Sequence, residues 1–190
     1  MSFSRSDNLI VASGPGKIEM DNSKAEPAES SNTGINFQRP CYALIEGFDT
    51  IQWDFDVQQI LADGDKDTMQ IAYVPLVEGQ VEKYIYASSM QFLASFSADS
   101  TGRTTLGRVY TDKGITYIEK AGNNTDIIHT LIGQTLEYDA LSDVGWLTIT
   151  GSETMPCMVD KARVPAIRYN VNTGQIQTSL SRSPGILGGR

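Results

Sequence analysis

The clearest pattern along the chain runs from Thr50 to Phe96, and it is a pattern of β-strands. Four apolar residues alternate with polar ones: Ile51, Trp53, Phe55 and Val57. Side chains of a strand point alternately to its two faces, so these residues would share one face and the polar residues the other. Aspartate and glycine then crowd residues 63–67, which predicts a turn.

The segments that follow continue the β pattern. Met69 to Val77 is apolar on both faces and rich in β-branched and aromatic residues, which predicts a strand covered on both sides. Val81 to Tyr86 predicts a further strand after a short turn. Met90 to Phe96 predicts either a strand or a short helix. At least three strands therefore follow one another, and a sheet can form locally.

Later segments are separated by turn residues. Leu106–Tyr110 and Ile115–Ile118 flank residues 111–114, Thr-Asp-Lys-Gly, which favour a hairpin. A final hairpin is predicted around residues 172–174. Residues 125–139 remain open between helix and strand, since the apolar spacing is helical but Gly133 disfavours a helix.

These elements amount to eight or nine strands, at most one or two short helices, and no repeat. We therefore predict an all-β fold, an antiparallel β-sandwich with a jelly-roll-like order. Residues 1–40 are dominated by Ser, Asn, Gly, Pro, Lys and Glu and predict an extended N-terminal arm. Residues 41–180 would form the body, and residues 181–190 a flexible or docked tail.

Charge is unevenly distributed along the 190 residues. The net charge is −1 over residues 1–40, −12 over residues 41–160 and +5 over residues 161–190, for a total of −8. An acidic body repels phosphate backbones, so we expect only weak nucleic-acid contact, through the basic C-terminal segment. No apolar run is long enough to span a bilayer, and no secretory signal is recognised, so we expect no membrane contact. We expect Cys41 and Cys157 to be reduced.

Candidate chemistry is sparse. Asp63, Asp65 and Asp67 occupy the first three ligand positions of a calcium loop, but Thr68 and Val74 replace the required glycine and glutamate. An acidic turn explains the aspartates better than a calcium site does. We therefore expect no cofactor.

Two other features invite a catalytic interpretation. Asp54 and Asp56 share one strand face, as the paired carboxylates of a glycosidase would, but alternation places Trp53 on the opposite face, and a solvated polar face explains the aspartates better. His129 is the only histidine and no nucleophile motif accompanies it, so we interpret it as a structural residue beside the core. We accordingly expect that the chain is not an enzyme.

The function that these features favour is a structural subunit that assembles with copies of itself. A β body with a long arm and an oppositely charged tail resembles, in layout only, the coat proteins of small viruses and the head or tail subunits of phages. That resemblance implies a virion component assembled in the host cytoplasm. The residues expected to make assembly contacts are Leu9, Ile10, Val11, Ile18, Arg163, Arg168 and Arg182.

Two alternatives remain. A carbohydrate-binding β-sandwich module would use aromatic side chains exposed together on one face. A small β-fold hydrolase, which has the least support, would use Asp54, Asp56 or His129 in one pocket.

Overall fold

The computed structural model describes residues 2–6, 8–25, 34–98, 104–140 and 145–178. Over these residues the chain forms 17 β-strands and no helix. The first strands are β1 (Ser2–Ser6), β2 (Leu9–Asp21), β3 (Cys41–Asp54), β4 (Gln59–Gly64), β5 (Gln70–Val77), β6 (Gln80–Val81), β7 (Lys83–Ser88) and β8 (Gln91–Ala98). They are followed by β9 (Thr104–Thr111), β10 (Ile115–Ala121), β11 (Ile127–Gly133), β12 (Thr135–Asp139), β13 (Trp146–Thr150), β14 (Cys157–Val159), β15 (Ala162–Val164), β16 (Ala166–Asn170) and β17 (Ile176–Gln177).

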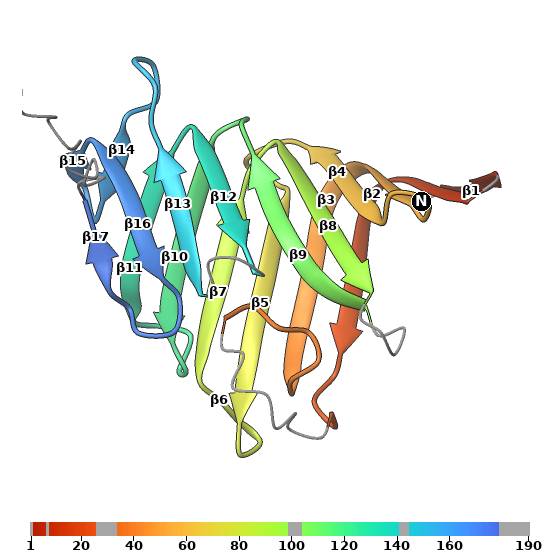
Figure 1. Ribbon diagram of the computed structural model, residues 1–190, viewed down its shortest axis with the longest axis horizontal. Coiled ribbons are helices and arrows are strands. Elements are labelled where there is room, and N and C mark those ends of the chain that lie inside the picture. Colours follow the sequence, from red (N-terminus) through yellow and green to blue (C-terminus); the bar gives the residue numbers. More distant parts are fainter. Residues whose placement is uncertain (1, 7, 26–33, 99–103, 141–144, 179–190) are drawn as a thin grey trace, which may run out of the picture.

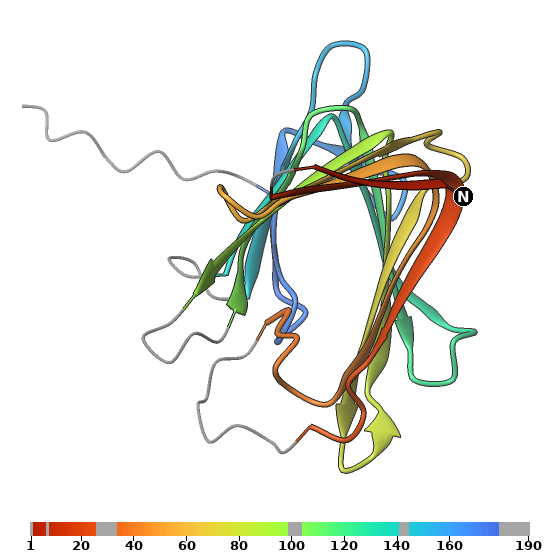
Figure 2. The ribbon, with the colours of Figure 1, turned by 90° about the vertical axis from the view of Figure 1, so that its right-hand side faces the viewer.

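The strands form one antiparallel sheet that is folded over like an arch (Figure 2). Strand β3 belongs to both sides of the fold: its residues 41–46 pair with β5, and its residues 48–54 pair with β4. Gly47 lies between the two parts with a φ of 69°, and a Cβ there would meet the carbonyl of Thr68. Glycine is thus required where the strand turns from one side of the arch to the other.

Each side of the arch is a half-sheet. The first half-sheet runs from residues 41–46 of β3 through β5, β7, β10, β11 and β14 to β15. The second runs from residues 48–54 of β3 through β4, β8, β9, β12, β13 and β16 to β17. The short β6 pairs only with the end of β5.

The strand order confirms the all-β, antiparallel prediction, but it does not establish a jelly roll. The chain passes back and forth between the half-sheets, so that β7 leads into β8, β9 into β10 and β11 into β12 (Figure 1). Successive strand pairs, such as β8–β9, β10–β11 and β12–β13, therefore alternate between the two half-sheets, whereas a jelly roll has Greek-key connections. The described sheet is not closed, because its last strands, β15 and β17, pair only with β14 and β16 and not with each other.

Two local predictions were wrong, and one alternative that the sequence left open is decided. Residues 111–114 do not close a hairpin, since β9 pairs with β8 and β12 while β10 pairs with β7 and β11. The strand that contains Ile51 ends at Asp54, although the alternating pattern continues to Val57, and residues 55–58 form the turn to β4. Residues 125–139 form β11 and β12, with Gly133 closely packed against Ile149. The number of strands was underestimated because β1, β2, β4, β14 and β15 fall outside the predicted strands and because residues 125–139 form two strands.

The N-terminal segment lies against its own chain. Strand β2 pairs along the length of β3, and β1 pairs with residues 9–13 of β2 on the outer side. Composition predicted an extended arm here because polar residues dominate, but the backbone of residues 9–21 completes a ladder with β3. The final hairpin is confirmed, since β16 and β17 pair around residues 171–175.

The core lies between the two half-sheets and is closed on one side by residues 34–37. The amide of Ile35 donates to the hydroxyl of Tyr138, in the second half-sheet, over 2.8 Å. The amide of Asn36 donates to the hydroxyl of Tyr73, in the first half-sheet, over 3.2 Å, and that hydroxyl donates to the carbonyl of Asn36 over 3.1 Å. Ile35 and Phe37 pack against the core. This segment therefore ties the two half-sheets together.

Cys41 and Cys157 are both buried, and neither forms a disulfide. No helix long and apolar enough to cross a bilayer occurs in the part of the chain that the structure describes.

Candidate functional site

A charged side chain occupies an inward position of β10. Ile115, Tyr117 and Glu119 alternate with less buried residues, so all three point into the core. Glu119 is only 3 % exposed. An unpaired buried carboxylate is strongly unfavourable, so its partners decide whether this position is tolerated.

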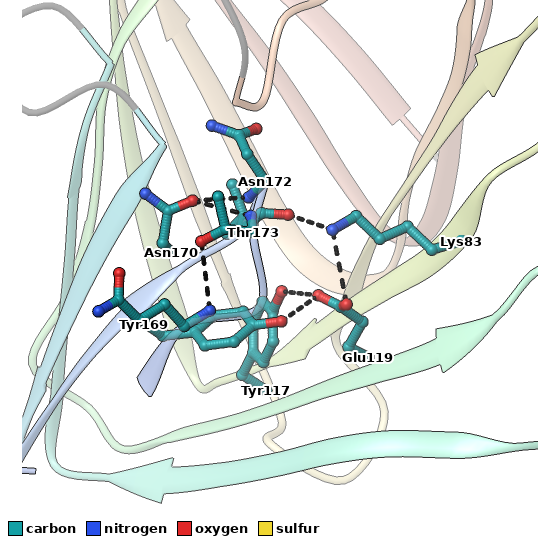
Figure 3. A network of polar contacts seen from close by, with 9 residues as sticks. Lys83, Tyr117, Glu119, Tyr169, Asn170, Asn172 and Thr173 are labelled. Carbon is teal, nitrogen blue, oxygen red and sulfur yellow. Dashed lines mark hydrogen bonds and ion pairs between the residues drawn. The ribbon is translucent and has the colours of Figure 1, made fainter. Parts of the chain in front are cut away.

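Three side chains satisfy the Glu119 carboxylate (Figure 3). Its Oε2 accepts hydrogen bonds from the hydroxyl of Tyr169, over 2.7 Å, and from that of Tyr117, over 3.0 Å. Its Oε1 lies 3.5 Å from the Nζ of Lys83, which also donates to the carbonyl of Val171. Tyr117, Glu119 and Lys83 belong to the first half-sheet and Tyr169 to the second, so the network spans the core.

The two phenols act as permanent donors. Burial, and after it the neighbouring Glu119 carboxylate, raises the pKa of Tyr117 well above its usual value of 10.0. Burial, followed by the hydrogen bond to Glu119, likewise raises the pKa of Tyr169 far above 10.0. A phenolate would lie beside a carboxylate in a dry environment, so both hydroxyls keep their protons and continue to donate.

The network continues to the surface through His129. Its ring makes an edge contact with Tyr169, with 5.8 Å between the ring centroids. Its Nδ1 lies 3.0 Å from Oδ2 of Asp160. Burial would raise the pKa of Asp160, but hydrogen bonds from the Thr130 amide and from His129 lower it below 3.8. His129 thus holds Asp160 and packs on the core.

A turn fixes the Val171 carbonyl that Lys83 contacts. The Oδ1 of Asn170 accepts hydrogen bonds from the amides of Asn172 and Thr173, both over 3.0 Å. This is the side-chain-capped turn that asparagine favours. The position of the carbonyl therefore depends on Asn170, which is itself buried.

We call Glu119 and its three partners, Lys83, Tyr117 and Tyr169, the clamp, because their contacts join the two half-sheets. Both oxygens of Glu119 have partners, and those partners come from both sides of the core. The pattern of β10 contains the signal for it, because period-two alternation puts Glu119 in register with Ile115 and Tyr117. Our sequence analysis ended this strand at Ile118 and therefore missed Glu119, along with Lys83 and Tyr169.

The aspartates that partly match a calcium loop have separate partners. Asp63 accepts a hydrogen bond from Gln91, and Asp65 accepts one from the amide of Asp67 within the turn. Among the described residues, no three His, Cys, Asp or Glu side chains are grouped so that they could hold a metal ion.

The candidate hydrolase residues lie in two different parts of the fold. The carboxylate of Asp54 accepts from the amides of Asp56 and Val57, which closes the turn after β3, and Asp56 accepts from the side chain of Asn8. His129 contacts Asp160 and Tyr169 instead. Asp54 and Asp56 thus lie together in the turn after β3, whereas His129 on β11 has different partners.

The expected assembly residues of the N-terminal segment have two different environments. Leu9, Ile10 and Val11 are half-buried in β2, between β1 and β3. Ile18 is 42 % exposed. It lies in residues 17–21 of β2, all of which are exposed and pair with β3 on one side only within the described structure. We call residues 17–21 the free edge of β2.

The basic residues lie at the other end of the sheet. Arg163 is exposed on β15, and the guanidinium of Arg168 on β16 lies 4.6 Å from the ring centroid of Trp146. Arg182 is outside the described residues.

Comparisons with known proteins give no relative for this chain. No protein-family model, no curated protein and no solved structure matches it.

Proposed function

We propose that this chain is a structural subunit that assembles with copies of itself, as a coat, head or tail component of a virus or phage particle. The observation that supports it best is the free edge of β2, which presents unpaired backbone groups and exposed apolar side chains on a sheet that is not closed. Exposed strand edges of this kind serve as templates for pairing with another chain.

The buried network supports the same proposal. A subunit of a particle has to keep its shape under load, and the clamp around Glu119 joins the two half-sheets through hydrogen bonds to a buried charge. In this proposal the facing half-sheets act as the two layers of a sandwich-like body. Strand pairing between copies would extend one of these layers, with the basic C-terminal segment facing acidic surfaces of neighbours or, weakly, nucleic acid.

A second candidate function, carbohydrate binding, has one observation in its favour. Tyr84 and Tyr86 lie on the outer face of β7 with their rings nearly parallel, at 7° to each other and 6.1 Å between centroids. Sugar rings stack on such aromatic faces. A glycan array probed with the full chain tests this, and binding that Tyr84→Ala abolishes would favour this candidate.

The assembly proposal is tested by light scattering on the full chain over a wide concentration range, followed by negative-stain microscopy. Masses above one chain, together with rings, tubes or shells, are the expected result. A single-chain mass at every concentration, up to the solubility limit, contradicts the proposal.

A further inference from the structure

The free edge of β2 has a defined hydrogen-bonding pattern. The amide of Asn22 donates to the carbonyl of Cys41, so Asn22 and Cys41 form a hydrogen-bonded pair of the β2–β3 ladder. Such pairs alternate with non-hydrogen-bonded ones in an antiparallel ladder. The N–H and C=O groups of Lys17, Glu19 and Asp21 therefore point away from β3, toward the free side.

The side chains of this edge alternate as well. Ile18 and Met20 pair with Ile45 and Ala43 of β3 and lie on the same face of the sheet as these residues. They remain 42 % and 36 % exposed because no strand lies beyond them in the described structure. Lys17 and Glu19 lie on the other face, 2.5 Å apart between Nζ and Oε1.

From these two patterns we propose that a second copy of this chain pairs with the free edge of β2, antiparallel, around a two-fold axis at Ile18. This inference rests on the proposed self-assembly and names the contact that makes it. In this register Lys17 lies opposite Glu19 of the second copy, Glu19 opposite its Lys17, and Ile18 opposite its Ile18.

Charge selects this register over its neighbours. The backbone groups of Lys17, Glu19 and Asp21 point toward the second copy. These residues lie opposite one another in the two copies only when the two-fold axis passes through a residue of the edge. If the axis passes through Lys17, Glu19 or Asp21, that residue lies opposite its own copy, and two like charges face each other. If the axis passes through Met20, Glu19 lies opposite Asp21, and two negative charges face each other. Only the axis at Ile18 pairs opposite charges at both hydrogen-bonded positions.

The ends of the edge are compatible with this contact. β1 covers β2 only from Leu9 to Ser13, and at the other end the chain turns at residues 23–24. In the proposed register Ser13 of the second copy falls opposite Ser23, beyond the end of β2. The strand β1 of each copy therefore lies just past the pairing segment of the other.

Cysteine cross-linking tests the register directly. Opposed non-hydrogen-bonded residues have Cα atoms about 4.5 Å apart, within the range that a disulfide requires. Ile18→Cys should therefore give a covalent dimer of the full chain under mild oxidation, seen on a non-reducing gel. Met20→Cys, on the same face and similarly exposed, is the matched control and should stay uncross-linked. The parent chain is a second control, because Cys41 and Cys157 are buried.

Charge reversal gives an independent readout. Lys17→Glu and Glu19→Lys should each raise the dimer dissociation constant by about tenfold or more, because like charges then face one another. The double variant restores the opposite charges and should recover pairing, as should an equimolar mixture of the two single variants.

The outcomes separate this inference from the function on which it rests. If the chain assembles but Met20→Cys cross-links as well as Ile18→Cys, or the double variant stays dissociated, the register is wrong and self-assembly stands. If the parent chain remains a monomer under all conditions, both fail.

Discussion

Tyr169 on β16 donates a 2.7 Å hydrogen bond to the carboxylate of Glu119 on β10, although these strands belong to opposite half-sheets. Lys83 of β7 approaches the other oxygen of the same carboxylate. One buried charge therefore joins the two sides of an arch whose sheet stays open at its ends. Together with residues 34–37, this contact fixes the spacing of the two half-sheets.

Removing the Tyr169 hydroxyl should weaken the fold without emptying the core. Tyr169→Phe should lower the free energy of unfolding by about 1.5–3 kcal/mol, since it removes a hydrogen bond to a buried charged group. Chemical denaturation followed by fluorescence measures this loss. Tyr42→Phe, at an exposed position, is the control and should change stability by less than about 0.5 kcal/mol. Equal losses in the two variants would show that the clamp contributes nothing specific.

Truncating the carboxylate should cost more than removing one of its donors. Glu119→Ala leaves Lys83 and two buried phenols without their common acceptor, and loss of one partner of a buried ion pair costs about 3–5 kcal/mol. Thermal unfolding followed by circular dichroism checks this order. A Glu119→Ala chain as stable as Tyr169→Phe would contradict the central role of the carboxylate.

Stability should decline in alkaline solution. Burial raises the pKa of Tyr73 to about 12 and that of Cys41 to about 11, and it raises the pKa values of Tyr117 and Tyr169 well above 10.0. A group whose pKa is higher in the folded chain contributes fully below its unfolded pKa and loses that contribution as the pH rises toward its folded pKa. The free energy of unfolding should therefore fall from about pH 9–10 upward, by about 1.4 kcal/mol per pH unit for each such group.

Denaturation curves recorded between pH 8 and 11.5 test this decline. Tyr169→Phe should have a shallower pH dependence than the parent chain, because one of the titrating groups is gone. A stability that is constant over this range would be inconsistent with the buried phenols.

The fold in β3 should depend on Gly47. Gly47→Ala would place a Cβ against the backbone of Thr68 at a φ of 69°, whereas Gly79→Ala has a similar φ of 78° and nothing within 4 Å. In both variants alanine has to adopt a positive φ, which lowers the free energy of unfolding by about 1 kcal/mol. In Gly47→Ala the clash with Thr68 should lower it by about 1–3 kcal/mol more. Comparing their denaturation midpoints isolates the steric contribution, and equal midpoints would refute the close approach.

Local alternation predicted about half of the strands, but not how the strands are arranged. The pattern around Ile51 and the turn at residues 172–174 identified a strand and a hairpin because side-chain period and turn chemistry are local properties. The hairpin predicted at residues 111–114 was wrong because the same turn residues suit both a hairpin and a connection between the two half-sheets. Which of the two forms depends on partners such as β7 and β12, which are distant in the sequence.

The candidate site was harder to foresee for the same reason. The inward position of Glu119 is implied by alternation from Ile115, but Lys83 and Tyr169 come from strands 36 and 50 residues away. Composition also predicted residues 1–40 as an arm, whereas backbone pairing with β3 places residues 9–21 in the sheet. Ladder formation needs few apolar side chains, so composition alone underestimates it.

The most direct test of assembly through this edge is sedimentation velocity on the parent chain and Glu19→Pro. The amide of Glu19 points away from β3, so proline there removes a donor from the free edge and leaves the pairing with β3 in place. Glu19→Ala, which keeps the amide, serves as the control. We predict that the parent chain sediments as an assembly and that Glu19→Pro sediments as a single folded chain with an unchanged circular dichroism spectrum. Identical sedimentation of the two proteins would contradict assembly through β2.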